Sequence, residues 1–194
     1  MDSYDKQYKT EVYLFGLPYP EFEAFVAKHV VKGGTALDLG CGQGRDALML
    51  ADYGYVVTGV DSSHVGVSQM VERANARGGV VHGVVDDLYA YPLTESFDLI
   101  VLDSILHFGK ADKKKELALL NAVADRIKAN GYLCLFVHKS DAKEKVLHEW
   151  FTEKKSQFAI AEEGYIDYVY EVKSTDFKSA FQYYMLILQR SARA

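Results

Sequence analysis

The stretch that decides the fold is Thr35-Ala36-Leu37-Asp38-Leu39-Gly40-Cys41-Gly42-Gln43-Gly44-Arg45-Asp46-Ala47-Leu48. It begins as an apolar strand, carries glycine at three alternate positions, and continues as an apolar-periodic helix. Glycine permits backbone angles that a Cβ forbids and lets a ligand approach the backbone closely. The helix that follows directs free N–H groups and a partial positive charge at the loop. The stretch therefore predicts a cradle for a ligand with a polar or anionic part, with Asp38 on its strand side.

A second acid indicates what kind of ligand this is. The β-branched stretch Tyr55–Val60 reads as a strand, and Asp61 closes it. Asp61 lies about twenty residues beyond the glycine loop, the distance at which a βαβ unit brings a carboxylate beside a ribose. The ligand is therefore expected to be a nucleoside with a polar tail.

Two such ligands fit the loop. Gly42-Gln43-Gly44-Arg45-Asp46-Ala47 matches the G-x-G-x-x-A pattern of NAD-binding proteins, whereas counting from Gly40 places Arg45 at the sixth position. Asp46, in the first helical turn, would repel a pyrophosphate and tolerates an ammonium group better. Asp38 also favours a positive amine. S-adenosylmethionine has a ribose, an adenine, an amine and a carboxylate, so it satisfies both acids and the N–H cradle.

Taken in order, the motifs resemble those of the class I S-adenosylmethionine-dependent methyltransferases over roughly residues 33–138. Asp38-x-Gly40-x-Gly42-x-Gly44 resembles their first motif, and Asp61 resembles the ribose acid of their second. The third motif, the fourth strand with its active-site end, and the fifth strand are matched by Val84–Leu88, Ser96–Ser104 and Gly131–Val137. The Gly-Cys-Gly-Gln-Gly-Arg run with a later Leu-His-Phe is also similar to the tellurite-resistance and thiopurine branch.

The resemblance implies a role for each motif. The glycines cradle the methionine and ribose, Asp38 orients the amino end, and Asp61 binds the ribose. Asp87 with Leu88 holds the adenine, and Asp86 competes for that role. The implied cofactor-binding residues are Asp38, Gly40, Cys41, Gly42, Gly44, Arg45, Asp61, Ser62, Asp86, Asp87, Leu88, Asp103 and Ser104. The implied catalytic residues, which border the methyl group, are His107 and Asp103, and no metal site is expected.

Several of these residues have a second interpretation. Asp61 precedes Ser62-Ser63 and also suits a helix N-cap. Arg45 either holds the methionine carboxylate or an anionic substrate, or forms a surface salt bridge with a neighbouring acid. His107 is either a general base, since its unperturbed pKa is near neutral, or a histidine packed under a loop. A base is optional, because transfer from a sulfonium often needs only alignment and desolvation. The aromatic residues of the N-terminal segment either form a lid over the cofactor or pack against the sheet.

Strands expected at 35–39, 55–60, 80–85, 97–102 and 131–138 alternate with helices at 44–53, 63–77 and 112–128, after a first helix at 19–31. This alternation predicts a parallel sheet with helices on both faces. A helix at 143–155 precedes two strands at 165–172 and 181–188, whose short connection predicts antiparallel pairing. The fold class is therefore α/β, a Rossmann-like, doubly wound, mostly parallel seven-stranded sheet with an antiparallel last strand. One domain is expected over 1–194, with a helical lid segment at 1–32 and the core at 33–194.

The composition of the chain excludes some classes of function. The net charge of −5 argues against a general nucleic-acid binder, and no apolar run reaches membrane-spanning length. Two cysteines without a CxxC pair fit a cytoplasmic protein. We therefore expect methyl transfer from S-adenosylmethionine to an O, N or S nucleophile on a small-molecule acceptor, by a monomer or homodimer without nucleic-acid or membrane partners. The alternatives are an NAD-dependent oxidoreductase and a non-catalytic S-adenosylmethionine-binding protein.

Overall fold

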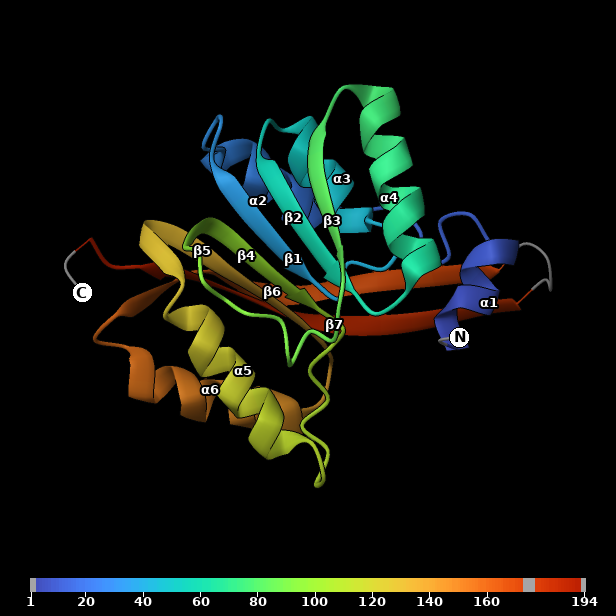
Figure 1. Cartoon of the computed structure of the whole chain (residues 1–194). Coiled ribbons are helices and arrows are strands. Elements are labelled where there is room, and N and C mark those ends of the chain that lie inside the picture. The colour runs from blue at the N-terminus through green and yellow to red at the C-terminus, as the bar shows by residue number, and fades with distance from the viewer. Residues whose placement is uncertain (1–2, 173–176, 193–194) are drawn as a thin grey trace. The chain divides into compact units, whose positions relative to one another are not determined.

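The computed structural model describes residues 3–172 and 177–192 (Figure 1). They form two compact units: unit 1 comprises residues 3–91 with 168–172 and 177–180, and unit 2 comprises residues 92–167 with 181–192. The strand order over the whole chain is β3-β2-β1-β4-β5-β7-β6. The predicted seven-stranded α/β fold with an antiparallel last strand is confirmed. The single domain expected over 1–194 remains a prediction.

Unit 1 carries the first part of the βαβ pattern. Its elements are α1 (Ser3–Thr10), α2 (Pro20–His29), β1 (Thr35–Leu39), α3 (Arg45–Asp52), β2 (Val56–Asp61), α4 (His64–Arg77) and β3 (Val80–Val85). The strands β1, β2 and β3 are parallel, and α4 packs along β3 (Figure 1). Because parallel strands end at the same sheet edge, the loop after β1 and Asp61 at the end of β2 become neighbours.

Unit 2 continues the pattern and then departs from it. Its elements are β4 (Phe97–Asp103), α5 (Lys113–Ala124), β5 (Ile127–His138) and α6 (Asp141–Lys154), with most of β6 (Phe158–Val172) and β7 (Phe177–Arg190). β4 and β5 are parallel, whereas β5 and β7 are antiparallel, with Leu135 opposite Leu186. The two helices contact each other through Trp150, whose indole N–H donates to Asn121 Oδ1 at 3.1 Å.

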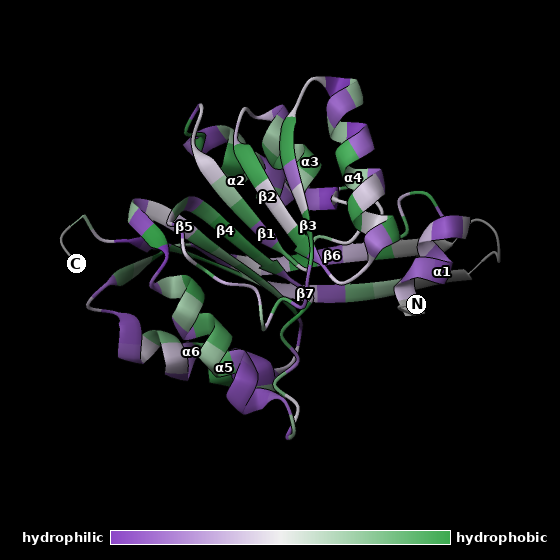
Figure 2. Cartoon of the chain, viewed as in Figure 1, coloured by the Kyte–Doolittle hydropathy of each residue, from purple (hydrophilic) through white to green (hydrophobic). Residues whose placement is uncertain are grey.

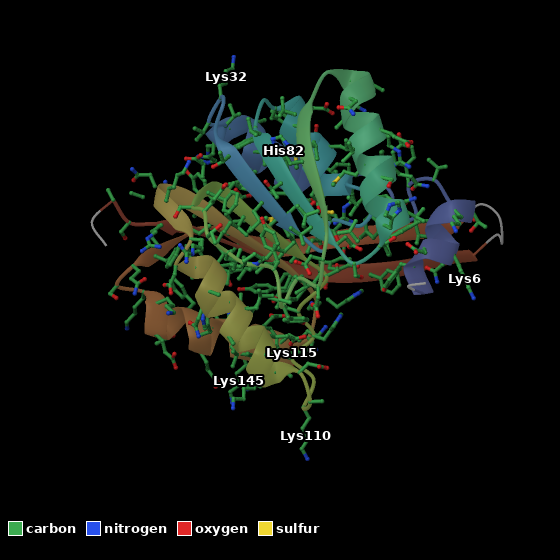
Figure 3. All side chains as sticks on the ribbon, in the orientation of Figure 1. Lys6, Lys32, His82, Lys110, Lys115 and Lys145 are labelled. Carbon is green, nitrogen blue, oxygen red and sulfur yellow. The ribbon has the colours of Figure 1, made fainter. Side chains whose placement is uncertain are left out.

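The hydropathy of the residues differs between the strands and the helices. Figure 2 shows hydrophobic residues concentrated in the central strands and hydrophilic ones on the helices. Ile100, Leu135 and Leu186 on β4, β5 and β7 are completely buried. Lys110, Lys115 and Lys145 extend outward from unit 2 (Figure 3), and Lys115 forms a surface ion pair with Asp112 at 3.0 Å. Within the part of the chain that the structure describes, no helix is long and apolar enough to span a membrane.

The starts of three strands and the end of one helix differ from the sequence prediction. β5 begins at Ile127 rather than 131, and α5 ends at Ala124 rather than 128. Phe97 pairs with Ile127 but Leu99 pairs with Tyr132, so extra residues bulge from β5, and polar residues there hide the strand pattern. β6 begins at Phe158 rather than 165, because a strand at the sheet edge tolerates the glycine and charges that precede 165.

β7 begins at Phe177 rather than 181. Residues 173–176, which the sequence places in the connection between the last two strands, lie outside the described residues. The remaining helices and strands agree with their predicted ranges to within two residues, apart from the ends given above and α1, which was expected only as part of a helical N-terminal segment.

Candidate functional site

The glycine loop closes tightly between β1 and α3. The backbone N–H groups of Gly40 and Cys41 both donate to the Val60 carbonyl oxygen of β2, at 2.8 and 3.1 Å. Gly42 and Gly44 have φ values of +50° and +82°, which disfavour any side chain. A Cβ on Gly44 would collide with Met70 of α4, and a Cβ on Gly42 would lie 2.6 Å from the Tyr8 hydroxyl oxygen. The close approach of neighbouring elements therefore requires glycine at both positions.

Asp61 joins this loop to the start of α4. Its Oδ2 accepts a hydrogen bond from the Gly42 N–H at 2.9 Å, and its Oδ1 accepts one from the Ser63 N–H at 2.8 Å. The N-cap of α4 is Ser63, whose hydroxyl accepts from the Gly66 N–H, so the N-cap interpretation of Asp61 is wrong. Each carboxylate oxygen can accept more than one hydrogen bond, which leaves Asp61 able to receive ligand hydroxyls.

Asp38 is a buried acid at the start of α3. Its Oδ2 accepts from the Ala47 N–H at 3.0 Å, which satisfies one free donor of the first helical turn. Burial, followed by repulsion from the Asp46 carboxylate, raises the pKa of Asp38 well above its ordinary value, against the opposing effects of Arg45 and of the Ala47 N–H. A buried carboxyl of this kind gains stabilisation when a positive ligand group arrives.

Arg45 takes the second of its two predicted roles, an ion pair with a neighbouring acid. Its guanidinium pairs with Asp46 at 3.1 Å and lies over the Tyr19 ring, 4.3 Å from the centroid. It also donates to the Phe15 carbonyl oxygen at 3.4 Å. Contact with a methionine carboxylate stays a prediction for Arg45.

Gln43 holds the N-terminal segment against the loop, a contact that sequence reasoning missed. Its buried side chain accepts from the Leu14 N–H at 2.8 Å and donates to the Glu11 carbonyl oxygen at 2.9 Å and to Gln69 Oε1 at 2.7 Å. Nothing in the sequence distinguishes this glutamine from other variable residues of a glycine loop. The N-terminal segment is therefore fixed to the cradle by a residue of the cradle itself.

The aromatic residues of that segment pack against one another, whereas their packing against the sheet stays a prediction. Tyr8 is buried and stacks on Tyr4 with ring centroids 5.8 Å apart, while Phe15 meets the Tyr8 ring edge-on at 6.3 Å. Asp5, which lies on α1 with Tyr4 and Tyr8, accepts a hydrogen bond from the Ser63 hydroxyl at 2.6 Å. The role of these rings as a lid over a cofactor stays a prediction.

Cys41 and Ser62 differ in accessibility. Cys41 is a buried free thiol, and burial, followed by the Asp38 and Asp61 carboxylates, raises its pKa well above the ordinary value. Cys41 therefore stays uncharged and inert as a nucleophile. Ser62 is exposed at the end of β2.

The predicted adenine acids shape the turn after β3. The Asp86 N–H donates to the Asp61 carbonyl oxygen at 3.1 Å, which places the third motif beside the second. Asp86 Oδ1 accepts from the Asp87 N–H at 2.8 Å, and Asp87 Oδ1 accepts from the Tyr89 N–H at 2.9 Å. Asp86 and Leu88 are half-buried and Asp87 is exposed. Adenine contact stays a prediction for either acid.

The predicted methyl-end residues belong to unit 2. Asp103 is the last residue of β4, and the Ser104 hydroxyl donates to its Oδ1 at 2.7 Å. His107 is exposed, and its backbone N–H donates to Glu116 Oε1 at 3.1 Å. Glu116 is only 1% exposed and was missed because it ends the Lys113–Lys115 run, which reads as a solvated helix face.

A cavity of about 620 Å³ borders the glycine loop in unit 1. Cys41, Gln43 and Arg45 of the loop line it, together with α3, α4 and the N-terminal segment. Asp38 and Asp61 lie outside its lining. Among the residues described here, no group of three or more His, Cys, Asp or Glu side chains is arranged to hold a metal ion.

The loop and both of its acids fall inside a known family domain. The model of a methyltransferase domain matches residues 36–131. The chain belongs to the S-adenosylmethionine-dependent methyltransferases. Membership in the methyltransferases confirms the resemblance inferred from the motifs and favours S-adenosylmethionine over NAD.

Individual members support this assignment at low identity. The cypemycin N-terminal methyltransferase of a Streptomyces species is 29% identical over 109 residues, which cover 56% of this chain and 44% of that protein. The chain thus spans about half the length of the curated methyltransferase it matches.

Two solved structures share the fold. The structure of TehB from Haemophilus influenzae has a TM-score of 0.71 at 19% identity, covering 98% of this chain and 66% of TehB. A structure from work on the conversion of a disulfide bond into a thioacetal group during echinomycin biosynthesis has a TM-score of 0.73 at 23% identity, covering 98% of this chain and 93% of that one.

The buried Asp38 predicts an unusual pH dependence of stability. Because its pKa is higher in the folded than in the unfolded chain, stability is lost as pH rises from the unfolded value through the folded one. Asp38→Asn removes the charge and keeps an oxygen for the Ala47 N–H. We expect the ligand-free variant to unfold at a higher temperature than the wild type, by a margin that is larger at about pH 8 than at about pH 5.

Thermal unfolding at both pH values measures this margin. Glu72→Gln, which removes an exposed charge from α4 in the same unit, is the control and should show no such trend. A margin for Asp38→Asn that shrinks as pH rises would contradict the assignment of a raised pKa.

Gln43 predicts a specific loosening of the N-terminal segment. Gln43→Ala removes three hydrogen bonds that join the loop to residues 11, 14 and 69, each worth roughly 1 kcal/mol. We expect trypsin to cleave at Lys6 and Lys9 at least about tenfold faster than in the wild type. Gln7→Ala, which changes an exposed glutamine of α1, is the control. Equal cleavage of both variants would show that Gln43 does not hold the segment.

Proposed function

We propose that this protein transfers a methyl group from S-adenosylmethionine to an O, N or S nucleophile on a small-molecule acceptor. The observation that carries the proposal is the glycine loop bonded to the Asp61 carboxylate and flanked by the buried Asp38, inside a matched methyltransferase domain. The alternative of a non-catalytic binder would keep these contacts but bury or block the methyl end, and it would show no turnover.

The residues present fit S-adenosylmethionine. Asp61 would accept hydrogen bonds from the ribose hydroxyls while keeping its bonds to the Gly42 and Ser63 N–H groups. Asp38 would stand near the ammonium group, which compensates the cost of keeping a carboxylate buried. Asp86 or Asp87, with Leu88, would hold the adenine.

Methyl transfer from a sulfonium requires little of the protein beyond correct placement of the acceptor. When bound, S-adenosylmethionine supplies a methyl group on a sulfonium, which is already a good leaving group. The protein then has to align the acceptor and exclude water. We propose that Asp103, Ser104 and His107 border the acceptor, as the motifs predict.

Several observations support a small-molecule acceptor. The net charge of −5 disfavours a nucleic-acid partner. One similar protein is named for methylation at an N-terminus, and a similar fold was solved in work on thioacetal formation, so both nitrogen and sulfur remain within the proposal. The proposal includes a cytoplasmic protein, consistent with the two free thiols, that acts as a monomer or homodimer.

Titration calorimetry with S-adenosylhomocysteine tests the proposal. We expect the wild type to bind this compound and to give no heat with NAD. Asp61→Asn loses the charge that would strengthen bonds to the ribose hydroxyls, each worth about 1.5–3 kcal/mol, so its affinity should fall roughly 10- to 100-fold.

Glu72→Gln is the matched control, since it removes an exposed acid of the same unit, and it should bind as the wild type does. Unfolding temperatures of both variants establish that they are folded. Heat with NAD and none with S-adenosylhomocysteine would reverse the choice of ligand.

A further inference from the structure

The cavity in unit 1 combines aromatic, apolar and cationic side chains. Its volume of about 620 Å³ lies within the range of pockets that bind small molecules. The described lining residues come from the N-terminal segment, α2, the glycine loop, α3, α4 and residues 168–169 of β6, all of which belong to unit 1. Because Asp38 and Asp61 are not among them, the cavity is separate from the two acids assigned to the cofactor.

Tyr13 joins two arginines of α4 at this cavity. Arg73 and Arg77 are one helical turn apart and therefore project from the same face of the helix. The Arg73 guanidinium lies over the Tyr13 ring, 4.5 Å from the centroid, and Arg77 donates to the Tyr13 hydroxyl oxygen at 3.5 Å. Tyr13 has a φ of +63°, which a bulky residue rarely adopts unless its contacts hold it there. The two arginines supply such contacts.

Arg73 differs from the other two arginines of the described lining in its charge partners. Arg45 pairs with Asp46 and Arg77 pairs with Asp52, each at 3.1 Å. No carboxylate among the described residues forms an ion pair with Arg73. The positive charge of Arg73 is therefore able to attract an anionic ligand.

The guanidinium of Arg73 is oriented by the glycine loop. It donates to the Gln43 carbonyl oxygen at 3.4 Å, a long hydrogen bond. A guanidinium carries several N–H donors in a planar fork, so Arg73 can also bind a carboxylate through two parallel hydrogen bonds. Glu23, the other acid of the described lining besides Asp52, accepts a hydrogen bond from the Tyr53 hydroxyl at 3.3 Å.

The apolar part of the lining favours an aromatic body on such an anion. Leu48 and Met49 of α3 are buried, whereas Phe15 and Leu17 of the N-terminal segment are 40% and 74% exposed. A ligand that covers these two side chains removes apolar surface from water, and an aromatic ring also stacks favourably on Phe15. The Tyr168 hydroxyl donates to the Phe15 carbonyl oxygen, which fixes this part of the segment to β6.

We propose that this cavity binds a small aromatic carboxylate with a single negative charge. Its carboxylate pairs with Arg73, and its rings pack between α3 and the N-terminal segment. A single charge is expected because Arg73 is the one arginine of the described lining without an acidic partner among the described residues. The site goes beyond methyl transfer, since it uses neither Asp38 nor Asp61 and takes its ligand without S-adenosylmethionine.

Binding at Arg73 has a consequence for the N-terminal segment. Arg73 contacts the backbone of Gln43, and the Gln43 side chain holds residues 11 and 14 of the segment. The ligand contacts the same segment through Phe15 and Leu17. Because the ligand binds only while the segment lies against α3 and α4, it stabilises that arrangement by mass action.

The first experiment compares two probes of nearly the same shape by titration calorimetry. 2-Naphthoate carries a carboxylate, whereas 2-naphthamide carries a neutral amide in its place. We expect the wild type to bind 2-naphthoate about 10- to 100-fold more tightly, because the amide loses the charge-assisted pair with Arg73. Equal affinities, or no binding of 2-naphthoate at millimolar concentrations, would overturn the proposal.

Variants of Arg73 locate the carboxylate. In Arg73→Met the preference for 2-naphthoate over 2-naphthamide should disappear, because both changes remove the same interaction. Arg73→Lys keeps the charge but not the planar fork, so a smaller preference should remain. Lys28→Met, which removes an exposed cation of α2 outside the described lining, is the control and should keep the full preference. A full preference in Arg73→Met, with an unfolding temperature that shows it to be folded, would overturn the assignment.

The second experiment measures protection of the N-terminal segment. Chymotrypsin cleaves after aromatic residues, and Tyr13 and Phe15 are both exposed. At a concentration of 2-naphthoate that saturates only the wild type, cleavage after these residues should slow at least about threefold in the wild type and not in Arg73→Met. Equal slowing in both proteins, or none in the wild type, would show that the probe binds elsewhere.

S-adenosylhomocysteine distinguishes this site from that of the cofactor. Saturation with this compound should leave the affinity for 2-naphthoate unchanged or higher. Competition between the two would place them in one site and overturn the proposal. The comparison of the two naphthyl probes needs no cofactor, so failure to bind S-adenosylhomocysteine would count against the proposed function alone.

Discussion

The Asp61 carboxylate is the contact on which the candidate site depends. It accepts from the Gly42 N–H and the Ser63 N–H, and so holds the glycine loop against the first turn of α4. Parallel pairing of β1 and β2 places the two strand ends side by side, which makes this contact possible. Left-handed glycines then let the chain turn from β1 into α3 without a side chain in the way.

Asp38 shows what this arrangement costs. A carboxylate that is buried beside Asp46 is unfavourable in the ligand-free protein, even with the Ala47 N–H and Arg45 nearby. The same charge becomes useful when a cationic ligand group neutralises it. Unfavourable electrostatics of this kind are typical of binding sites, where stability is exchanged for ligand affinity.

The sequence predicted the parts of the protein that follow local rules. The order of an apolar strand, alternating glycines and an apolar-periodic helix located the loop. The β-branched run ending in Asp61 located the second strand. The short connection between the last strands predicted the antiparallel β7. These features depend on residue types at fixed spacing, which are visible without any three-dimensional information.

The sequence did not predict the residues that act over long separations. Gln43 bonds to Leu14, 29 positions away, and His138 meets Tyr183, 45 positions away. Glu116 ends a run of lysines that reads as a solvated surface, yet it is buried. Such contacts follow from which strands and helices become neighbours, so residue spacing carries no signal for them.

The most direct test of the central claim is a crystal structure of the protein with S-adenosylhomocysteine. We predict that the ribose hydroxyls lie within hydrogen-bonding distance of the Asp61 carboxylate and that the amino group lies on the Asp38 side of the loop. A complex in which the compound occupies the 620 Å³ cavity instead, with no ribose hydroxyl at the Asp61 carboxylate, would contradict the account.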